Sequence, residues 1–351
     1  MKTKFNLRRV VRLSVSFTIL FFISAMIVLP SYGAKKHKEI ELIYSTFAPV
    51  GYPYLYDMSK LFADMVNERG KGIVHLNTYY GGTLLRGEHA LPGLQAGTAD
   101  VIFVVSGRAA GVLPILGLWN IPVWDNMASA SEAFKFDSPA MKIVNEHIAK
   151  KNFYMLPTGN AAEFIFTKKI VQTVSDLKGL KIRASGRAEG RALQALGATP
   201  VVMPSADIAQ SLQRNIIDGV LISAHTAQGR KIEELTKSML MYPVAFQGGG
   251  MLFAKDKWDS WPEDVQKVFT DVGKEWGVKA IGYHEEAILS EHQIEATLVP
   301  IYKKAGLKII YPSAEEVEVF KKALEPVAGW WAKKAGEGVS NTLLKYTDYG
   351  K

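Results

Sequence analysis

Residues 179–222 read GLKIRASGRAEGRALQALGATPVVMPSADIAQSLQRNIIDGVLI, and this stretch decides the fold class. Short apolar runs rich in β-branched residues predict strands at 179–184, 199–202 and 217–222. The two segments between them, 188–196 and 205–214, have apolar residues at helical spacing. The alternation of strand and helix predicts a mostly parallel sheet with helices on its faces.

The same alternation occurs earlier in the chain and predicts a second α/β unit. Strands are expected at 40–44, 73–79 and 99–105, and helices at 54–69 and 87–96. Further strands are expected at 152–156, 163–167, 239–246, 251–254 and 307–311, and a helix at 313–335. Helical spacing from 262 to 298 predicts one helix of roughly 54 Å that crosses both units as a spine. A ligand cleft is expected between the two α/β domains.

Composition narrows the function classes. The 351 residues include no cysteine, which excludes disulfides, thiolate metal sites and cysteine nucleophiles. The net charge of +8 is concentrated near the N-terminus, in Lys2, Lys4, Arg8, Arg9 and Arg12. The remainder holds 37 basic and 34 acidic residues. This near balance argues against a nucleic-acid partner.

The N-terminus has the three parts of a secretory signal. The basic segment is followed by an apolar stretch over residues 13–29 and then by small residues over 30–34. We therefore expect a signal peptide at 1–34, cleaved near Gly33 or Ala34, and an exported mature protein. The length of the apolar stretch leaves an uncleaved membrane anchor as the alternative.

Enzyme motifs are absent from the sequence. There is no phosphate-binding G-x-x-x-x-G-K-[ST] loop, no H-E-x-x-H and no G-x-S-x-G, and the seven histidines have no metal-ligand spacing. The triple glycine at 248–250 is interpreted as a close backbone approach near a hinge or cleft. Neither a cofactor nor a metal is expected.

One arginine stands out as a candidate ligand-binding residue. The run DLKGLKIR, residues 176–183, places Arg183 at the end of a short strand, just before a loop containing Ser185 and Gly186. The planar guanidinium suits bidentate binding of a carboxylate. The alternative is a surface arginine paired with an acidic side chain of the protein.

Several spaced motifs resemble one known family. They are residues 79–84 (YYGGTL), 94–100 (LQAGTAD), 176–183, 196–203 (LGATPVVM), 211–213 (SLQ), 217–219 (IDG) and 258–266 (WDSWPEDVQ). Together they resemble the solute-binding proteins of tripartite ATP-independent periplasmic (TRAP) transporters, of the C4-dicarboxylate-binding type. The resemblance covers about residues 39–325.

This resemblance implies a bilobal α/β periplasmic-binding-protein fold joined by hinge strands and a long spanning helix. The implied lobes are 35–158 plus 247–300 and 159–246 plus 301–351. The implied function is capture of a small organic carboxylate by Arg183 between the lobes, without catalysis. The ligand would be delivered in the periplasm to integral-membrane TRAP permease subunits.

Three positions depart from the family pattern. Glu163 stands where many members have a second arginine, Ile222 where some have asparagine, and Ser205 where some sugar-acid binders have an aromatic residue. A Glu163 facing the ligand implies an ammonium or hydroxyl group near the other end of that ligand, away from the carboxylate that Arg183 binds. In the alternative, Glu163 points outward and pairs with Lys168 or Lys169. A sugar acid is disfavoured, and a dicarboxylate would lack a second arginine unless Arg187 supplies it.

Loops at strand ends supply further candidates, each of which the sequence leaves open as core or surface. They are Phe47, Tyr52, Tyr54, Ser106, Arg108, Gly186, Phe246 and Gln247.

Two other functions stay open from the sequence. An exported binding protein of this kind can feed a membrane sensor kinase, and an exported enzyme would need Glu163 and a histidine as an acid–base pair.

Overall fold

The computed structural model describes residues 37–50, 55–87, 89–287 and 291–349. Residues 39–351 form one compact unit. The expected signal peptide and its cleavage positions lie outside the described residues. Among the helices of the described ranges, none is both long and apolar enough to cross a bilayer.

The described residues form helices and strands throughout. The strands are β1 (Ile40–Ser45), β2 (Val74–Tyr79), β3 (Val101–Val105), β4 (Phe153–Thr167), β5 (Lys181–Ala184), β6 (Thr199–Val202), β7 (Gly219–Ser223), β8 (Ser238–Ala254) and β9 (Lys308–Ile310). The α-helices are α1 (Leu55–Arg69), α2 (Ala90–Gln95), α3 (Ser106–Ala109), α4 (Met127–Ala133), α5 (Pro139–Ala149), α6 (Arg187–Ala195), α7 (Ile208–Gln213), α8 (Ala224–Gly229), α9 (Lys255–Ser260), α10 (Glu263–Ala287), α11 (Glu291–Lys304), α12 (Ala314–Leu324), α13 (Pro326–Ala335) and α14 (Glu337–Leu344). Short 3-10 helices are η1 (Pro114–Asn120), η2 (Val174–Leu177), η3 (Ser205–Asp207) and η4 (Ile232–Glu234).

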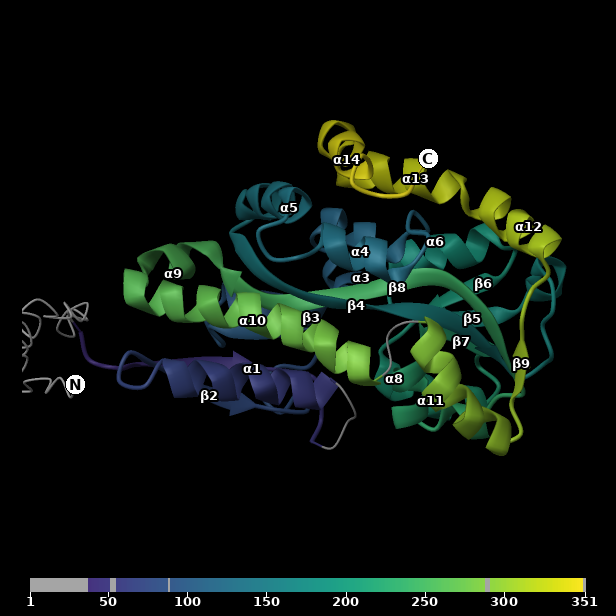
Figure 1. Ribbon diagram of the computed structural model, residues 1–351, viewed down its shortest axis with the longest axis horizontal. Helices are drawn as coiled ribbons and strands as arrows, with labels where there is room; N and C mark the ends of the chain where they lie inside the picture. The colour runs from purple at the N-terminus through teal and green to yellow at the C-terminus, as the bar shows by residue number, and fades with distance from the viewer. Residues whose placement is uncertain (1–36, 51–54, 88, 288–290, 350–351) are drawn as a thin grey trace, which may run out of the picture. The chain divides into compact units, whose positions relative to one another are not determined.

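The strands join in one sheet of order β2-β1-β3-β8-β4-β7-β5-β6, and β9 pairs with β8 (Figure 1). Strands β2, β1 and β3 are parallel to one another, as are β7, β5 and β6. The long strands β4 and β8 run antiparallel between these two sets. The predicted α/β class, with two parallel units joined by hinge strands, is therefore confirmed. The proposed lobe boundaries remain a prediction.

The prediction of separate strands at 152–156 and 163–167, and at 239–246 and 251–254, was wrong. Each pair belongs to one strand, β4 or β8, because the pairing continues through residues that usually interrupt strands. Pro157 pairs with Gly250, and a Cβ on Gly250 would lie 2.3 Å from the carbonyl oxygen of Leu156. The expected close approach at the glycine triplet is confirmed. Register shifts between Thr158 and Ala161 absorb the irregularity.

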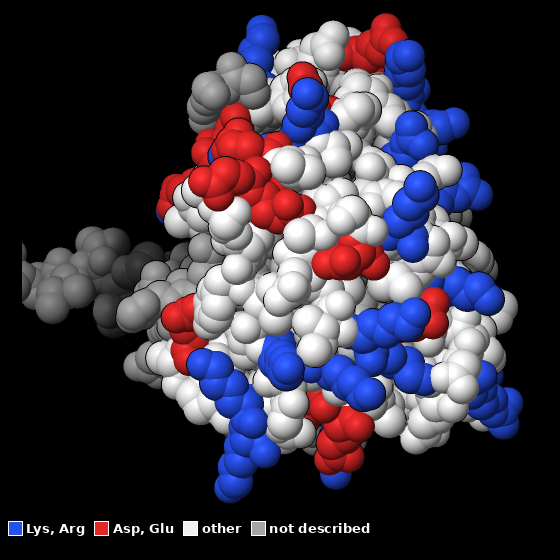
Figure 2. All heavy atoms as spheres, turned by 90° about the vertical axis from the view of Figure 1, so that its right-hand side faces the viewer, with Lys and Arg blue, Asp and Glu red and all other residues white. Residues whose placement is uncertain are grey.

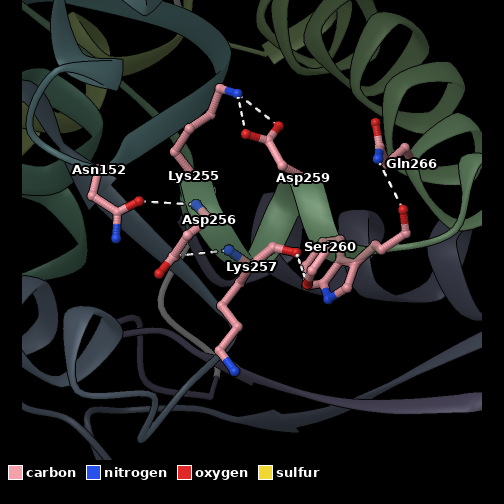
Figure 3. A network of polar contacts seen from close by, with 8 residues as sticks. Asn152, Lys255, Asp256, Lys257, Asp259, Ser260 and Gln266 are labelled. Atoms are coloured by element: carbon pink, nitrogen blue, oxygen red, sulfur yellow. Dashed lines mark hydrogen bonds and ion pairs between the residues drawn. The ribbon is translucent and has the colours of Figure 1, made fainter.

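A corner joins the start of β4 to the helices that follow β8 (Figure 3). Asn152 adopts the left-handed conformation, with φ of 64°, which asparagine tolerates better than most residues. Its side-chain Oδ1 accepts a hydrogen bond of 2.8 Å from the Asp256 amide, and its carbonyl accepts one of 3.0 Å from Lys255. Lys255 also pairs with Asp259 one turn along α9. These bonds fix the direction in which the chain enters α10.

The expected helix over 262–298 is divided between α10 and α11, which are described on either side of residues 288–290. Phe269, Val272 and Trp276 of α10 are buried, as their spacing predicts. They pack in a core with α1, β1–β3 and α9, where the Trp276 and Phe62 rings lie 5.1 Å apart. Helix α10 lies along α1 and β4 (Figure 1).

The C-terminal helices pack against the middle of the chain. The expected helix over 313–335 is two helices, α12 and α13, because Pro326 begins a new one. Trp331 of α13 donates a hydrogen bond of 2.9 Å to the carbonyl of Pro114. The end of the molecule that carries β9 and α12 has basic and acidic side chains intermixed (Figure 2).

The Gly250 contact gives a prediction about the hinge strands. Replacing Gly250 with alanine should destabilise the protein by about 1–3 kcal/mol, because the new Cβ would overlap the Leu156 carbonyl. Gly329→Ala in the exposed part of α13 is the matched control, since nothing lies within 4 Å of its Cβ position. The control should be neutral or stabilising by up to about 1 kcal/mol. Urea unfolding of both variants measures this, and equal effects would contradict the interpretation.

Candidate functional site

A pocket lies where the carboxyl ends of β3, β5 and β7 meet the middle of β4 and β8. Ends of parallel strands are the usual ligand position in α/β folds. The walls come from both parallel sets of the sheet. The lining residues are Phe47, Leu55, Met58, Phe103, Val105, Arg108, Thr158, Ala161, Glu163, Arg183, Ser185, Ser205, Ile222, Ser223, His225, Thr226, Gln247, Gly248 and Gly249.

The two sides of the pocket differ in chemistry. The side that belongs to the parallel strands β2, β1 and β3 and to helix α1 is mostly apolar. Its apolar lining residues are Phe47, Leu55, Met58, Phe103 and Val105. Phe47 stacks on Phe103 with ring centroids 5.9 Å apart. The opposite side carries most of the polar and charged groups. The pocket therefore suits a molecule with a polar end and a compact apolar body.

Arg183 is the buried cation of the polar side. It is 3% exposed, at the end of β5 between β6 and β7. Its Nε donates to the Met203 carbonyl at 3.1 Å and its Nη1 to the Leu221 carbonyl at 3.2 Å. Burial lowers the pKa of Arg183, and the nearby Glu189 and Glu163 oppose that shift.

No ion pair of Arg183 is formed in the described part of the chain, so two backbone carbonyls fix its position without cancelling its charge. An arginine remains charged at any physiological pH. A buried charge without a counter-ion is costly. The alternative of a surface arginine paired with an acidic side chain is wrong, because Arg183 is buried and bonds to two backbone carbonyls.

Glu163 faces the pocket from β4 and is 3% exposed. Its Oε2 is buried without a hydrogen-bonding partner. Burial is the main reason that the pKa of Glu163 lies well above its usual value, and the neighbouring Glu189 adds to this, while Arg183 lowers it. The alternative of an outward-pointing Glu163 is wrong, since Lys168 contacts Leu212 and Asn215 instead.

Glu189 of α6 is the centre of a buried polar network behind the pocket. It is fully buried, and its Oε2 accepts a hydrogen bond of 2.6 Å from the Ser185 amide. Its Oε1 accepts bonds from the Ser185 hydroxyl, from Asn120 at 3.1 Å and from Gln247 at 3.3 Å. The sequence analysis did not single out Glu189, because its partners Asn120 and Gln247 lie far from it in the chain.

Gln247 of β8 links this network to the other side of the pocket. Its Oε1 accepts from the Ser106 hydroxyl at 2.8 Å and from the Gly107 amide at 3.0 Å. Its Nε2 donates to the Ser185 hydroxyl at 3.0 Å. The amide thus joins the end of β3 to the loop after β5.

A close backbone contact accompanies these bonds. A Cβ on Gly186 would lie 2.0 Å from the Gly107 carbonyl oxygen. A Cβ on Gly107 would lie 2.4 Å from the Ser185 hydroxyl and 2.6 Å from Glu189. Only glycine at both positions lets the two loops meet at this distance. Gly186 therefore shapes the site from behind and does not line it.

A hollow next to the pocket is rich in arginine. It shares Phe47, Arg108 and Ser205 with the pocket and adds Arg86, Arg230 and Asp207. The Nη2 of Arg230 donates to the Ser205 hydroxyl at 3.0 Å. Three arginines against one aspartate give this hollow a positive charge balance, which favours anions.

The other predicted residues divide into four groups. Phe47, Ser205, Ile222, Arg108 and Gln247 line the pocket with Arg183 and Glu163. Ser106 and Phe246 were expected in the wall but lie behind it: Ser106 bonds Gln247, and the Phe246 carbonyl accepts from Asn120. Tyr52 and Tyr54 lie outside the described residues. Arg187 is exposed and is not among the lining residues.

Two lining residues gave no signal in the sequence. Thr158 is 5% exposed, with its hydroxyl oxygen buried and unpartnered. His225 lies two residues beyond β7, and burial lowers its pKa to about 3, so it is neutral at physiological pH. In the described ranges, no group of three acidic or histidine side chains is arranged to hold a metal ion.

Comparisons with known proteins place the chain among bacterial binding proteins. The sequence profile of bacterial extracellular solute-binding proteins of family 7 matches residues 44–334. The sialic acid-binding periplasmic protein of Vibrio cholerae is 24% identical over 302 residues, covering 82% of this chain and 87% of its own.

Two solved structures share the fold. A TRAP periplasmic solute-binding protein from Desulfovibrio salexigens with bound orotic acid has a TM-score of 0.78 at 20% identity, covering 88% of this chain and 97% of its own. A Bordetella pertussis extracytoplasmic solute receptor that binds pyroglutamic acid also has a TM-score of 0.78, at 18% identity, covering 89% and 99%.

The environment of Glu163 predicts a pH-dependent gain in stability for Glu163→Gln. Because the folded-state pKa is raised above the usual 4.5, Glu163 stabilises the fold most fully below that pH, and this stability is lost as the pH rises toward the raised pKa. Glutamine stays neutral at every pH. The variant should therefore gain up to about 1.4 kcal/mol per pH unit over wild type above pH 4.5. Chemical unfolding from pH 4 to 9 measures this, and a constant difference would contradict it.

Proposed function

Because this chain belongs to the bacterial extracellular solute-binding proteins of family 7, the solute-binding proteins of TRAP transporters, we propose that it captures a small organic carboxylate and delivers it to the membrane permease. The membership confirms the resemblance seen in the sequence. The characterised relatives are receptors, and this function requires no catalysis.

Arg183 is the observation that carries the proposal. It is buried at the carboxyl end of β5, held by two backbone carbonyls, and faces a pocket between the two parallel sets of strands. A carboxylate can accept two parallel hydrogen bonds from a guanidinium, and this pairing is strong in a dry site. The arginines of the neighbouring hollow attract the same anion from solvent.

The apolar side defines the rest of the ligand. Five apolar side chains oppose Arg183, so the ligand carries a compact body with few hydroxyl groups. The orotic and pyroglutamic acids bound by two structural relatives are small ring carboxylates of this kind. The relative from V. cholerae binds sialic acid, a larger polyhydroxylated acid. The pocket chemistry favours the former type.

Ligand capture closes the two predicted lobes around β4 and β8. The pocket takes lining residues from both parallel sets, so a ligand that contacts both stabilises the closed state over the open one. The register shifts of β4 fall at its middle, beside the pocket. The closed form then docks on the permease at the outer face of the membrane, which is consistent with an exported protein.

Replacing Arg183 tests the function. A thermal-shift screen of orotate, pyroglutamate, succinate and sialic acid identifies a carboxylate that raises the melting temperature, because a ligand of the folded state stabilises it. For that carboxylate, Arg183→Ala should lower the affinity at least about 30-fold by calorimetry, since a buried charge-assisted pair is lost. Arg183→Lys should restore only part of it, because lysine lacks the fork.

Arg187→Ala is the matched control. Arg187 is exposed, four residues along the chain, and carries the same charge without lining the pocket. Its affinity should stay within about twofold of wild type. Equal affinities for Arg183→Ala and wild type would refute the proposed role.

A further inference from the structure

Two buried carboxyl groups meet behind the ligand pocket. Glu163 of β4 and Glu189 of α6 are 3% and 0% exposed, and their side chains are in hydrogen-bonding contact. Two carboxylates cannot both stay ionised in such contact, because their charges repel in a medium that screens weakly. One proton must lie between them.

The surroundings decide which carboxyl carries that proton. Glu189 accepts hydrogen bonds from the Ser185 amide and hydroxyl, from Asn120 and from Gln247. Several hydrogen-bond donors around one carboxyl group stabilise its ionised form. Glu163 receives fewer hydrogen bonds: Gln247 contributes one, and among the described residues its buried Oε2 has no donor. The proton therefore resides on Glu163 and is donated to Glu189.

A protonated Glu163 has one remaining function in the pocket. With its O–H engaged by Glu189, its other oxygen is a carbonyl-type acceptor, and Glu163 lines the same pocket as Arg183. Arg183 does not reach this acceptor to form an ion pair and bonds to Met203 and Leu221 instead. A ligand carboxylate on Arg183 would share the pocket with this oxygen, which has two lone pairs and can accept a donor in addition to Gln247.

We propose that Glu163, sharing one proton with Glu189, is the specificity-determining residue of the pocket: it accepts a hydrogen bond from a neutral donor, a hydroxyl or amide N–H, on the carbon next to the ligand carboxylate. This inference rests on the proposed function of carboxylate capture. It assigns the ligand to α-hydroxy acids or their cyclic amide counterparts.

The same geometry disfavours the other α-substituted acids. An α-keto acid would place a second acceptor against Glu163, leaving two buried oxygens without a donor. An α-amino acid would bring an ammonium group into a pocket that Arg183 and Arg108 already make positive. Its binding would require ionised Glu163 beside ionised Glu189.

The shared proton also couples binding to pH. The groups that act on Glu163 are Glu189 from α6, Arg183 from β5 and Gln247 from β8. Arg108 from α3 and neutral His225 from α8 line the same pocket. An anion on Arg183 offsets the charge that favours ionised Glu163, so the complex holds the proton more tightly than the free protein. Affinity should therefore fall as the pH rises, by up to about tenfold per pH unit where only the complex keeps the proton.

The first test needs no ligand. An infrared difference spectrum of wild type minus Glu163→Gln should contain the carbonyl stretch of a protonated carboxylic acid at neutral pH. Glu234→Gln is the control, because Glu234 is exposed and paired with Lys231, and its difference spectrum should show a carboxylate only. A carboxylate signal for Glu163 at neutral pH would overturn the shared proton. It would leave the role of Arg183 unaffected.

The second test compares α-substituents on fixed carbon skeletons. The probes are lactate, pyruvate and alanine; leucic acid, ketoleucine and leucine; phenyllactate, phenylpyruvate and phenylalanine; and pyroglutamate. On the skeleton that binds best, the hydroxy acid should bind at least about tenfold more tightly than the keto and amino acids by calorimetry. Preference for a keto or amino acid, or no binding by any probe, would overturn the assigned ligand class. The thermal-shift screen and the Arg183→Ala measurement test carboxylate binding independently of this ligand class.

Two variants separate hydrogen bonding from packing, with the tightest hydroxy acid as the probe. Glu163→Gln keeps a carbonyl oxygen and an N–H toward Glu189. The affinity of this variant for the ligand should therefore be independent of pH between 5 and 9, and ligand binding should no longer be accompanied by proton uptake. Glu163→Leu has similar bulk without an acceptor and should lose at least about tenfold. Wild-type pH dependence retained in Glu163→Gln, or equal affinity in Glu163→Leu and wild type, would overturn the proposal.

Discussion

The arrangement of the pocket depends on the position of one buried charge. Arg183 is removed from water, and within the described ranges its side chain hydrogen-bonds only to backbone carbonyls. Burying a charge in this way costs stability that the fold must supply elsewhere. Full neutralisation by a carboxylate of the protein would remove that cost, and it would also remove the attraction for an external anion. The structure keeps Glu163 and Glu189 close enough to moderate the field of Arg183 but not to pair with it.

The long strands β4 and β8 connect this charge to the rest of the fold. They pair with each other and with both parallel sets, and they carry Glu163 and Gln247 into the pocket. Gln247 uses both ends of its amide, accepting from Ser106 and Gly107 and donating to Ser185. Polar contacts from the two parallel sets thus meet on the strands that cross between them, so a change in strand geometry alters both sides of the pocket.

The sequence predicted the repeating parts of the fold better than its junctions. The strands β5 and β7 could be predicted from their apolar runs, because most residues of β5 and all residues of β7 are buried. The continuity of β4 and β8 was not predictable, because Pro157 and the triple glycine usually end strands, and only their mutual pairing shows why they do not. The division between α12 and α13 could have been predicted, because Pro326 stands at the first position of α13.

The site shows the same division between local and long-range information. Arg183 was identifiable because its motif and its position at a strand end coincide. Glu189 was not, because its role comes from Asn120 and Gln247, which lie far away in the sequence. Glu163 was recognisable only because it replaces the arginine of many family members, and the sequence left the orientation of its side chain open. Its protonation state depends on Glu189, so neither carboxyl could be interpreted without the other. The selectivity of such a pocket is thus set by a pair of residues that no single position in the sequence encodes.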